Sequence, residues 1–308
     1  MNKKKTIITI LIVCLIFFGI VLGKNCLSYK LPNSAMGVRS VVAKGNIDTL
    51  FIGSSGYRKG VDMQMLVNEL PGESFMMTYN GNEPFNIYLE LKELLKEDVK
   101  INRLIIDFNP SMMDRGADLS DKRLLWDVSM STKIELWNEL KKKSNTSFFD
   151  FYDYWVLSNN DYMATYVVSY PLISARYYYG GSTPADETKG KSAKELDEMP
   201  IVENPGIDKL EEESIINIID LCNENNIDLV FLESPRYVTM EKDKNYKEKS
   251  KALCRIIEEN GGKYILRTDL GFDNNNPNFY SDLTHMSGEG KREFTRKLID
   301  CLKLRYDY

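Results

Sequence analysis

Histidine is almost missing from this sequence, whose 308 residues include only His285. Five cysteines are present and none forms a Cys-x-x-Cys pair, so the chain lacks the Cys/His sets that hold structural zinc. Cys222, Cys254 and Cys301 each fall in an apolar helical pattern, which is typical of buried free thiols. We therefore expect no metal site and no cofactor.

Clusters of positive charge are also scarce beyond the N-terminus. The formal net charge is −5, and the later basic run at residues 141–143 is typical of a solvated helix face. Nucleic-acid binding needs clustered lysine and arginine to contact phosphates, so we expect no nucleic-acid partner. The hydrophobic content of 43% and the charged content of 28% are those of a globular protein with a sizeable core.

The N-terminus departs from this average composition. Lys3, Lys4 and Lys5 precede an uncharged apolar run over residues 6–23, which Lys24 closes. At about 1.5 Å per residue, a helix over this run nearly spans the ~30 Å hydrocarbon core of a bilayer. Basic residues before the run favour a cytoplasmic N-terminus and an exported remainder. We predict a single-pass anchor of the cell membrane over residues 1–24. A cleaved signal peptide is the alternative, although residues 21–23 make a poor cleavage site.

Apolar runs and amphipathic patterns alternate along the rest of the chain. Strands are predicted at residues 48–53, 74–79, 103–108, 227–233 and 262–267, and helices at 61–70, 83–96, 209–225, 246–260 and 287–304. Such alternation predicts an α/β fold, with a mostly parallel five-stranded sheet covered by helices on both faces. We expect a polar linker at residues 25–46 and an extracytoplasmic domain at residues 47–308.

A long insertion at residues 111–205 interrupts this alternation. It is predicted to hold a helix over residues 122–142, an aromatic-rich part over 148–179 and a polar loop over 180–200. A stretch of this length inside a domain is typical of a functional lid or subdomain. Its aromatic residues either stack on carbohydrate or form the core of the insertion; those noted are Trp126, Trp137, Trp155 and Tyr177–Tyr179.

The ends of the predicted strands carry the candidate chemistry. Ligands of such sheets bind at the carboxyl ends of the strands, where Ser54 and Ser55 follow the first one. A serine needs a base with a pKa near neutrality, and His285 is the only imidazole in the chain. Asp282 lies three residues earlier, so one turn brings its carboxylate to the ring and fixes the tautomer. Each signal alone is also compatible with an ordinary turn or a surface histidine.

Taken in chain order, these residues resemble the SGNH (GDSL-like) hydrolase superfamily. Ser55 follows the first strand, Gly81 the second and Asn109 the third, and Asp282 and His285 precede the last helix. The resemblance implies a flavodoxin-like fold in which Ser55 is the nucleophile of a Ser-His-Asp triad. It also implies an oxyanion hole made by the Ser55 N–H, the Gly81 N–H and the Asn109 amide.

The match to the family motifs has two departures. Ser54 in Gly53-Ser54-Ser55 stands where the family commonly has aspartate, and residues 107–110 keep only the asparagine of the Gly-x-Asn-Asp block. Ser54 and Asn80 adjoin the matched motifs, and Arg236 follows the fourth strand. We expect these three as possible substrate contacts, with Arg236 suited to an anionic group.

The Gly-Ser-Ser variant and the single anchor resemble the envelope acyl-transfer members of this superfamily, DltD-like D-alanyl transfer proteins and anchored O-acetyltransfer proteins. That resemblance implies a multi-spanning membrane acyltransferase (MBOAT) as partner. It also implies acetyl or D-alanyl transfer to a cell-envelope glycan or teichoic-acid-like polymer. Two alternatives stay open: an esterase acting on carbohydrate or lipid esters, and a catalytically silent scaffold for a membrane acyltransferase.

Overall fold

The computed structural model describes residues 3–30, 37–110, 113, 116–143, 147–157, 180–182, 185–201, 206–238, 240 and 244–306. The side chains of residues 24–30, 143, 156–157 and 244 lie outside this description.

A single parallel sheet organises the described part of the chain. Its strands are β1 (Asn46–Gly53), β2 (Ser74–Thr78), β3 (Lys100–Asp107), β4 (Asp228–Leu232) and β5 (Lys263–Ile265). They lie in the order β2-β1-β3-β4-β5 and all pair in parallel. This is the flavodoxin-like order, so the predicted fold class is confirmed.

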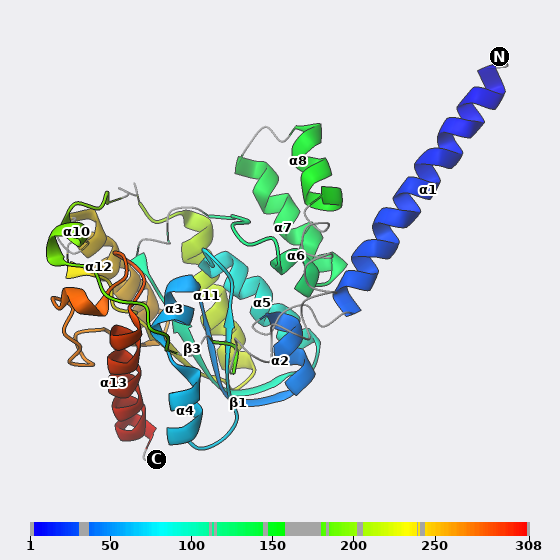
Figure 1. Cartoon of the computed structure of the whole chain (residues 1–308). Coiled ribbons are helices and arrows are strands. Elements are labelled where there is room, and N and C mark those ends of the chain that lie inside the picture. The colour runs from blue at the N-terminus through cyan, green and yellow to red at the C-terminus, as the bar shows by residue number, and fades with distance from the viewer. Residues whose placement is uncertain are drawn as a thin grey trace.

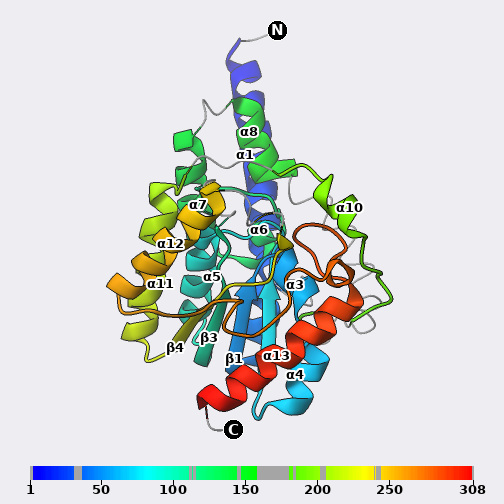
Figure 2. The ribbon, with the colours of Figure 1, turned by 90° about the vertical axis from the view of Figure 1, so that its left-hand side faces the viewer.

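Helices cover both faces of the sheet because the central strands are apolar on both sides. In β1, Leu50 and Ile52 point into one core and Phe51 into the other, and all three are fully buried. The first face is covered by α5 (Pro84–Lys96), α11 (Lys209–Glu224) and α12 (Lys244–Glu259). The second is covered by α3 (Ser55–Gly60), α4 (Met63–Glu69) and α13 (Gly288–Tyr306), as Figures 1 and 2 show.

The predicted linker at residues 25–46 is wrong in its second half. Residues 38–44 form α2 (Val38–Lys44), because Val38 and Val41 are spaced to share one helix face. Both side chains are fully buried in the core, and the Val38 N–H donates to the Tyr79 hydroxyl at 2.9 Å. The folded domain therefore begins before residue 47.

The insertion also differs from its prediction. Two helices, α6 (Leu124–Asp127) and α7 (Met130–Lys143), replace the single helix expected over residues 122–142. The helix is interrupted at Val128 and Ser129. Val128 has an extended backbone, and the Ser129 hydroxyl donates a hydrogen bond to Glu93 at 2.9 Å. Further elements follow: α8 (Phe148–Tyr152), the π-helix η2 (Asp153–Leu157), α10 (Ala193–Asp197) and, before α13, the 3-10 helix η4 (Pro277–Phe279).

The three tryptophans of the insertion pack against the core. Trp126 is 1% exposed within the main core, so it cannot stack on a carbohydrate. Trp137 contacts the ring of Phe151 at 5.7 Å and that of Tyr154 at 4.9 Å between centroids, and Trp155 contacts Tyr154 at 5.0 Å. Tyr177–Tyr179 lie outside the described residues.

The N-terminal helix α1 (Lys3–Lys30) projects away from the domain (Figure 1). Its segment Lys3–Gly23 is long and apolar enough to cross a membrane, and none of the tested window is buried against the protein. The helix continues past the predicted end of the anchor at residue 24. The four cysteines whose side chains are described, Cys14, Cys222, Cys254 and Cys301, are free thiols, and only Cys222 is fully buried.

Candidate active site

Ser55 occupies a tight turn between the central strand and the first helix on its face. β1 ends at Gly53, Ser54 is extended, and α3 begins at Ser55. A Cβ atom on Gly53 would lie 2.6 Å from the Tyr57 ring and 2.7 Å from the Cβ of Asp107, so this turn requires glycine. The side chain of Ser55 stays partly exposed at the carboxyl end of β1.

His285 is held by the loop that precedes α13. The N–H of Ser281 donates to the His285 carbonyl at 2.9 Å, and Tyr280 forms an antiparallel bridge with Met286. Inside this narrow loop, one carboxylate oxygen of Asp282 accepts the backbone N–H groups of Thr284 and His285, each at 2.8 Å. These backbone contacts fix the position of His285 independently of the contacts of its ring.

A chain of hydrogen-bond contacts joins the three residues predicted to act together. The Oγ of Ser55 lies 3.1 Å from Nε2 of His285, and Nδ1 of His285 lies 2.8 Å from Oδ2 of Asp282. Burial alone would raise the pKa of Asp282, but hydrogen bonds from His285 and from the Thr284 N–H outweigh it and hold the pKa well below its usual range. An ionised Asp282 accepts the Nδ1 proton, which leaves the Nε2 lone pair facing Ser55.

Gly81 and Asn109 lie just past the ends of β2 and β3, the two strands that flank β1. The register pairs Gly53 with Thr78 on β2 and Ile52 with Ile106 on β3. Ser55, Gly81 and Asn109 follow the carboxyl ends of these three strands by two or three residues. Gly81 has a φ of 60°, in the left-handed region that favours glycine, and Asn109 is 6% exposed. The structure thus collects the predicted oxyanion residues at one edge of the sheet.

The loop after β2 is braced by a buried ion pair in the insertion. Asp121 and Arg123 have side chains only 2% and 6% exposed, and the Arg123 Nε donates to Asp121 at 2.9 Å. Arg123 also donates to the Thr78 carbonyl at 3.2 Å, while Asp121 accepts the Asn80 N–H at 2.8 Å. Burial alone would raise the pKa of Asp121, yet Arg123 outweighs it and lowers that pKa. Sequence reasoning missed this pair because the insertion matches no family motif.

Three residues expected as possible substrate contacts have protein partners instead. Ser54 is 4% exposed, and its hydroxyl points at Asp107 with an Oγ–Oδ2 distance of 3.5 Å. Arg236 is 2% exposed and donates to the Thr284 carbonyl at 2.7 Å. The side chain of Asn80 is exposed but accepts from Arg58 at 2.8 Å. Ser54 and Arg236 are therefore buried side chains whose internal partners support the site, and their contact with a substrate stays a prediction.

Asp107 is the centre of that support. It accepts hydrogen bonds from the hydroxyls of Ser54 and Ser234, next to the turn between β1 and α3. Burial raises the pKa of Asp107, and the nearby positive charge of Arg236 offsets part of that rise. Arg236 also packs against the first turn of α3, where a Cβ atom on Gly56 would lie 2.7 Å from its Nη1. One guanidinium therefore contacts both the helix that follows Ser55 and the loop that carries His285.

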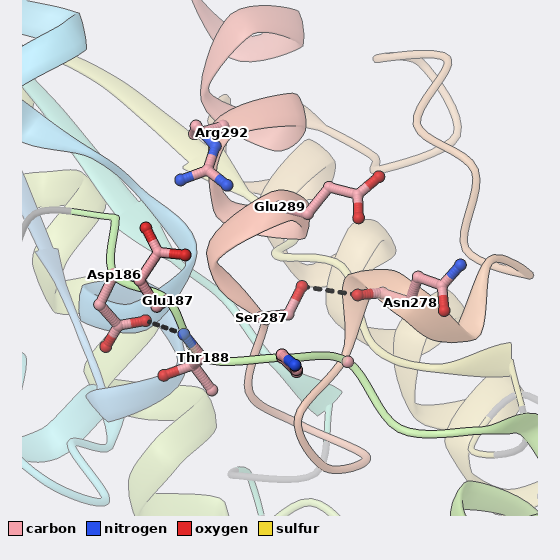
Figure 3. Close-up of a pocket in the computed structure, with 9 residues that line it drawn as sticks. Asp186, Glu187, Thr188, Asn278, Ser287, Glu289 and Arg292 are labelled. Atoms are coloured by element: carbon pink, nitrogen blue, oxygen red, sulfur yellow. Dashed lines mark hydrogen bonds between the residues drawn. The ribbon is translucent and has the colours of Figure 1, made fainter.

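A polar pocket of about 330 Å³ lies between the loop at residues 186–190 and the start of α13 (Figure 3). Its polar groups partly satisfy one another: Ser287 donates to the Asn278 carbonyl at 2.6 Å, and the Thr188 N–H donates to Asp186 at 2.9 Å. A neighbouring hollow is lined by Lys59, Lys291 and Ser281, among others. Lys59 follows Ser55 by one helical turn, so this polar surface extends along α3 toward the candidate nucleophile.

This chain resembles known proteins in structure rather than in sequence. No protein-family model matches it, and no curated protein sequence does. It is similar in structure to a GDSL-like lipase from Bacteroides thetaiotaomicron, with a TM-score of 0.39 and 10% identity over 85% of this chain and 90% of the lipase. It is also similar to a protein from Bacteroides fragilis named as an acylhydrolase, with a TM-score of 0.42 and 8% identity over 86% of this chain and 94% of that protein.

Proposed function

We propose that this chain is a membrane-anchored serine acyl-transfer enzyme that works through an acyl-serine intermediate on Ser55. The observation that carries the proposal is the contact chain Ser55–His285–Asp282, with distances of 3.1 Å and 2.8 Å, at the carboxyl edge of the sheet. Those distances are within hydrogen-bond reach, as a nucleophile, its base and the group that orients the base require.

In the proposed reaction, Nε2 of His285 takes the Ser55 proton while Oγ attacks the carbonyl carbon of an acyl donor. Negative charge develops on the carbonyl oxygen, and the Ser55 N–H, the Gly81 N–H and the Asn109 amide are the donors proposed to stabilise it. One such donor is worth about 10²–10³ in rate. The bond to the leaving group then breaks, and His285 returns the proton to that group, leaving acyl-Ser55.

The second half repeats these steps with an acceptor hydroxyl. His285 removes the acceptor proton, the acceptor oxygen attacks acyl-Ser55, and the serine leaves with the proton restored. We propose an acetyl or D-alanyl group as the acyl unit and a cell-envelope glycan or teichoic-acid-like polymer as the acceptor. The polar pocket and the hollow beside α3 support a polyhydroxylated acceptor, since their lining offers charged and hydroxyl groups rather than an apolar tunnel. An MBOAT-type membrane protein is the proposed source of the acyl group, and α1 is the proposed anchor beside it.

Ester hydrolysis is the second candidate. The His285 side chain is 23% exposed and Ser55 is partly exposed, so water reaches the same atoms that an acceptor would. Water in place of the acceptor hydroxyl converts the transferase into an esterase without a change in any residue role.

A fluorophosphonate probe tests the nucleophile. The folded full-length chain should be labelled at neutral pH, and Ser55→Ala and His285→Ala should abolish the labelling. Ser131→Ala is the matched control, because Ser131 is an exposed serine at the start of α7. Absence of labelling in the folded wild-type protein would show a catalytically silent scaffold and refute the proposal. With an aryl acetate as donor, acetylation of added glycans against release of free acetate then separates transfer from hydrolysis.

A further inference from the structure

An exposed aromatic surface lies on the insertion, away from the candidate active site. Phe148 and Phe149, the first two residues of α8, are 73% and 78% exposed, and Phe151 is 42% exposed. These fractions are high for phenylalanine, which is usually among the most buried residue types. We name the surface made by Phe148, Phe149 and Phe151 the α8 aromatic surface.

The α8 aromatic surface is held firmly by the protein beneath it. Ser147 and Asp150 form a reciprocal capping box at the start of α8, with the Asp150 carboxylate accepting the Ser147 N–H at 2.7 Å. On the opposite side, the buried Tyr154 donates to the Lys133 carbonyl of α7 at 2.7 Å. Asp153 also pairs with Lys122 at 2.8 Å. These contacts hold the segment in place, while the rings of Phe148 and Phe149 stay exposed.

Two basic residues come shortly before these rings in the chain. Lys141 and Lys142 are exposed at the carboxyl-terminal end of α7, directly before the connection to α8, and the Lys142 side chain is 68% exposed. Exposed phenylalanine on a helix, with lysine nearby in the chain, is typical of segments that lie at a bilayer surface, where the rings enter the boundary between headgroups and acyl chains and lysine meets the lipid phosphates.

The position of α8 relative to α1 indicates which surface it meets. Both views place α8 at the end of the domain from which α1 projects, on the side toward which the strands run (Figures 1 and 2). The apolar side chains of α1, such as Ile12, are exposed in the same way as those of α8. A bilayer crossed by α1 therefore lies over the end of the domain that carries α8.

We propose that α8 is a second membrane contact, with Phe148 and Phe149 inserted in the interfacial layer of the bilayer that α1 crosses. The inference rests on the proposed anchoring by α1. A single helix leaves a domain free to tilt and rotate, whereas two contacts fix its orientation. With both in place, the carboxyl edge of the sheet, and Ser55 with it, faces the lipid surface, from which a membrane-bound acyl donor would approach.

Photo-crosslinking in nanodiscs of phosphatidylglycerol and phosphatidylcholine tests the proposal on the full-length chain. Phe149→p-benzoylphenylalanine keeps an aromatic ring at an exposed site and should give lipid adducts on illumination. Leu304→p-benzoylphenylalanine is the matched control, because Leu304 is 84% exposed near the end of α13, at the opposite end of the domain. We expect a severalfold greater lipid-adduct yield at position 149 than at position 304.

A third variant separates this inference from its premise. Ile12→p-benzoylphenylalanine reports whether α1 lies in lipid. Lipid adducts at position 12 without any at position 149 would overturn the second contact while leaving the anchor intact. Adducts at position 149 with another copy of the chain, or with another protein, in place of lipid would overturn it as well. Because the readout is an adduct mass, a failed fluorophosphonate reaction at Ser55 does not affect it.

Discussion

Replacing Asp282 by asparagine keeps the His285 ring in the site but changes which of its nitrogens carries the proton. In the wild-type protein the Asp282 carboxylate accepts the N–H and hydroxyl of Thr284 and the N–H and Nδ1 of His285, over distances of 2.8–3.0 Å. In Asp282→Asn, the amide oxygen can keep the three contacts made by Oδ1. The amide NH₂ then takes the place of Oδ2 and faces Nδ1. Two donors cannot bond each other, so the ring moves its proton to Nε2.

The exchange of carboxylate for amide lowers the reaction rate in two ways. A protonated Nε2 donates to Ser55 and cannot take its proton, and restoring the productive tautomer leaves two facing donors unsatisfied, at about 1–3 kcal/mol. The imidazolium formed during reaction also loses a full negative charge, worth about 4 kcal/mol for charge centres about 4 Å apart at an effective dielectric constant near 20. These losses overlap, and about 4–5.5 kcal/mol corresponds to a 10³–10⁴-fold lower kcat.

Steady-state hydrolysis of an aryl acetate measures the rate, and ¹⁵N spectra of the imidazole measure the tautomer. Since His285 is the only histidine, each spectrum reports one ring without further assignment. Thr284→Val is the control, because it removes one hydroxyl contact and leaves the carboxylate in place. The reasoning is refuted if Asp282→Asn shows the Nε2–H tautomer and still turns over within tenfold of wild type.

Three further predictions concern the framework around the site. Gly56→Ala should slow ester hydrolysis and destabilise the fold by about 1–3 kcal/mol in urea unfolding, because the new Cβ meets Arg236 at 2.7 Å. Burial lowers the pKa of Lys291 to about 8, against about 10.4 in an unfolded chain. The unfolded chain thus binds more protons above pH 8, so stability should rise with pH from about 8 to 9.5, and Lys291→Met should flatten that rise in pH-dependent melting. Leu104→Ala, at a fully buried position of β3, should cost about 2–5 kcal/mol in urea unfolding, whereas Leu304→Ala at an exposed position should cost under about 0.5 kcal/mol.

Each of these expectations has an outcome that contradicts it. Gly206→Ala is the control for Gly56→Ala, since a Cβ atom there meets nothing within 4 Å, and equal effects of the two changes would refute the contact argument. An unchanged pH slope in Lys291→Met would show that this ammonium is not the group being titrated. A Leu104→Ala loss as small as that of Leu304→Ala would place β3 outside the cooperative core.

The sheet could be predicted from sequence because its strands leave a strong local signal. Residues 50–52 and 104–106 are uninterrupted apolar runs, as expected for strands buried on both faces, and each is followed by polar or glycine residues. The contact between Ser55 and His285 was predictable for another reason. With one imidazole and parallel strands, the topology leaves few places where a serine and that ring can meet.

Other parts of the site depend on tertiary contacts that local sequence does not encode. Nothing in the sequence distinguishes Ser54, which turns inward to Asp107, from its neighbour Ser55, which faces the open edge. The bracing of the loop after β2 by Asp121 and Arg123 comes from a segment over 40 residues along the chain, and charged residues in an insertion are usually expected on a surface. Helix α2 was missed because seven residues carry too short a periodic pattern.

The separation of Ser55 and His285 along the chain has a consequence for biogenesis under the proposed function. Ser55 precedes His285 by 230 residues, and the two meet only when the central strand and the loop before the last helix are both in place. Under the proposed topology, export begins after the N-terminal anchor, so the serine reaches the outer side of the membrane long before the imidazole. Under the proposed mechanism, a partly translocated chain cannot accept an acyl group. If the proposed function and topology hold, the chain order delays reactivity until export and folding of the domain are complete.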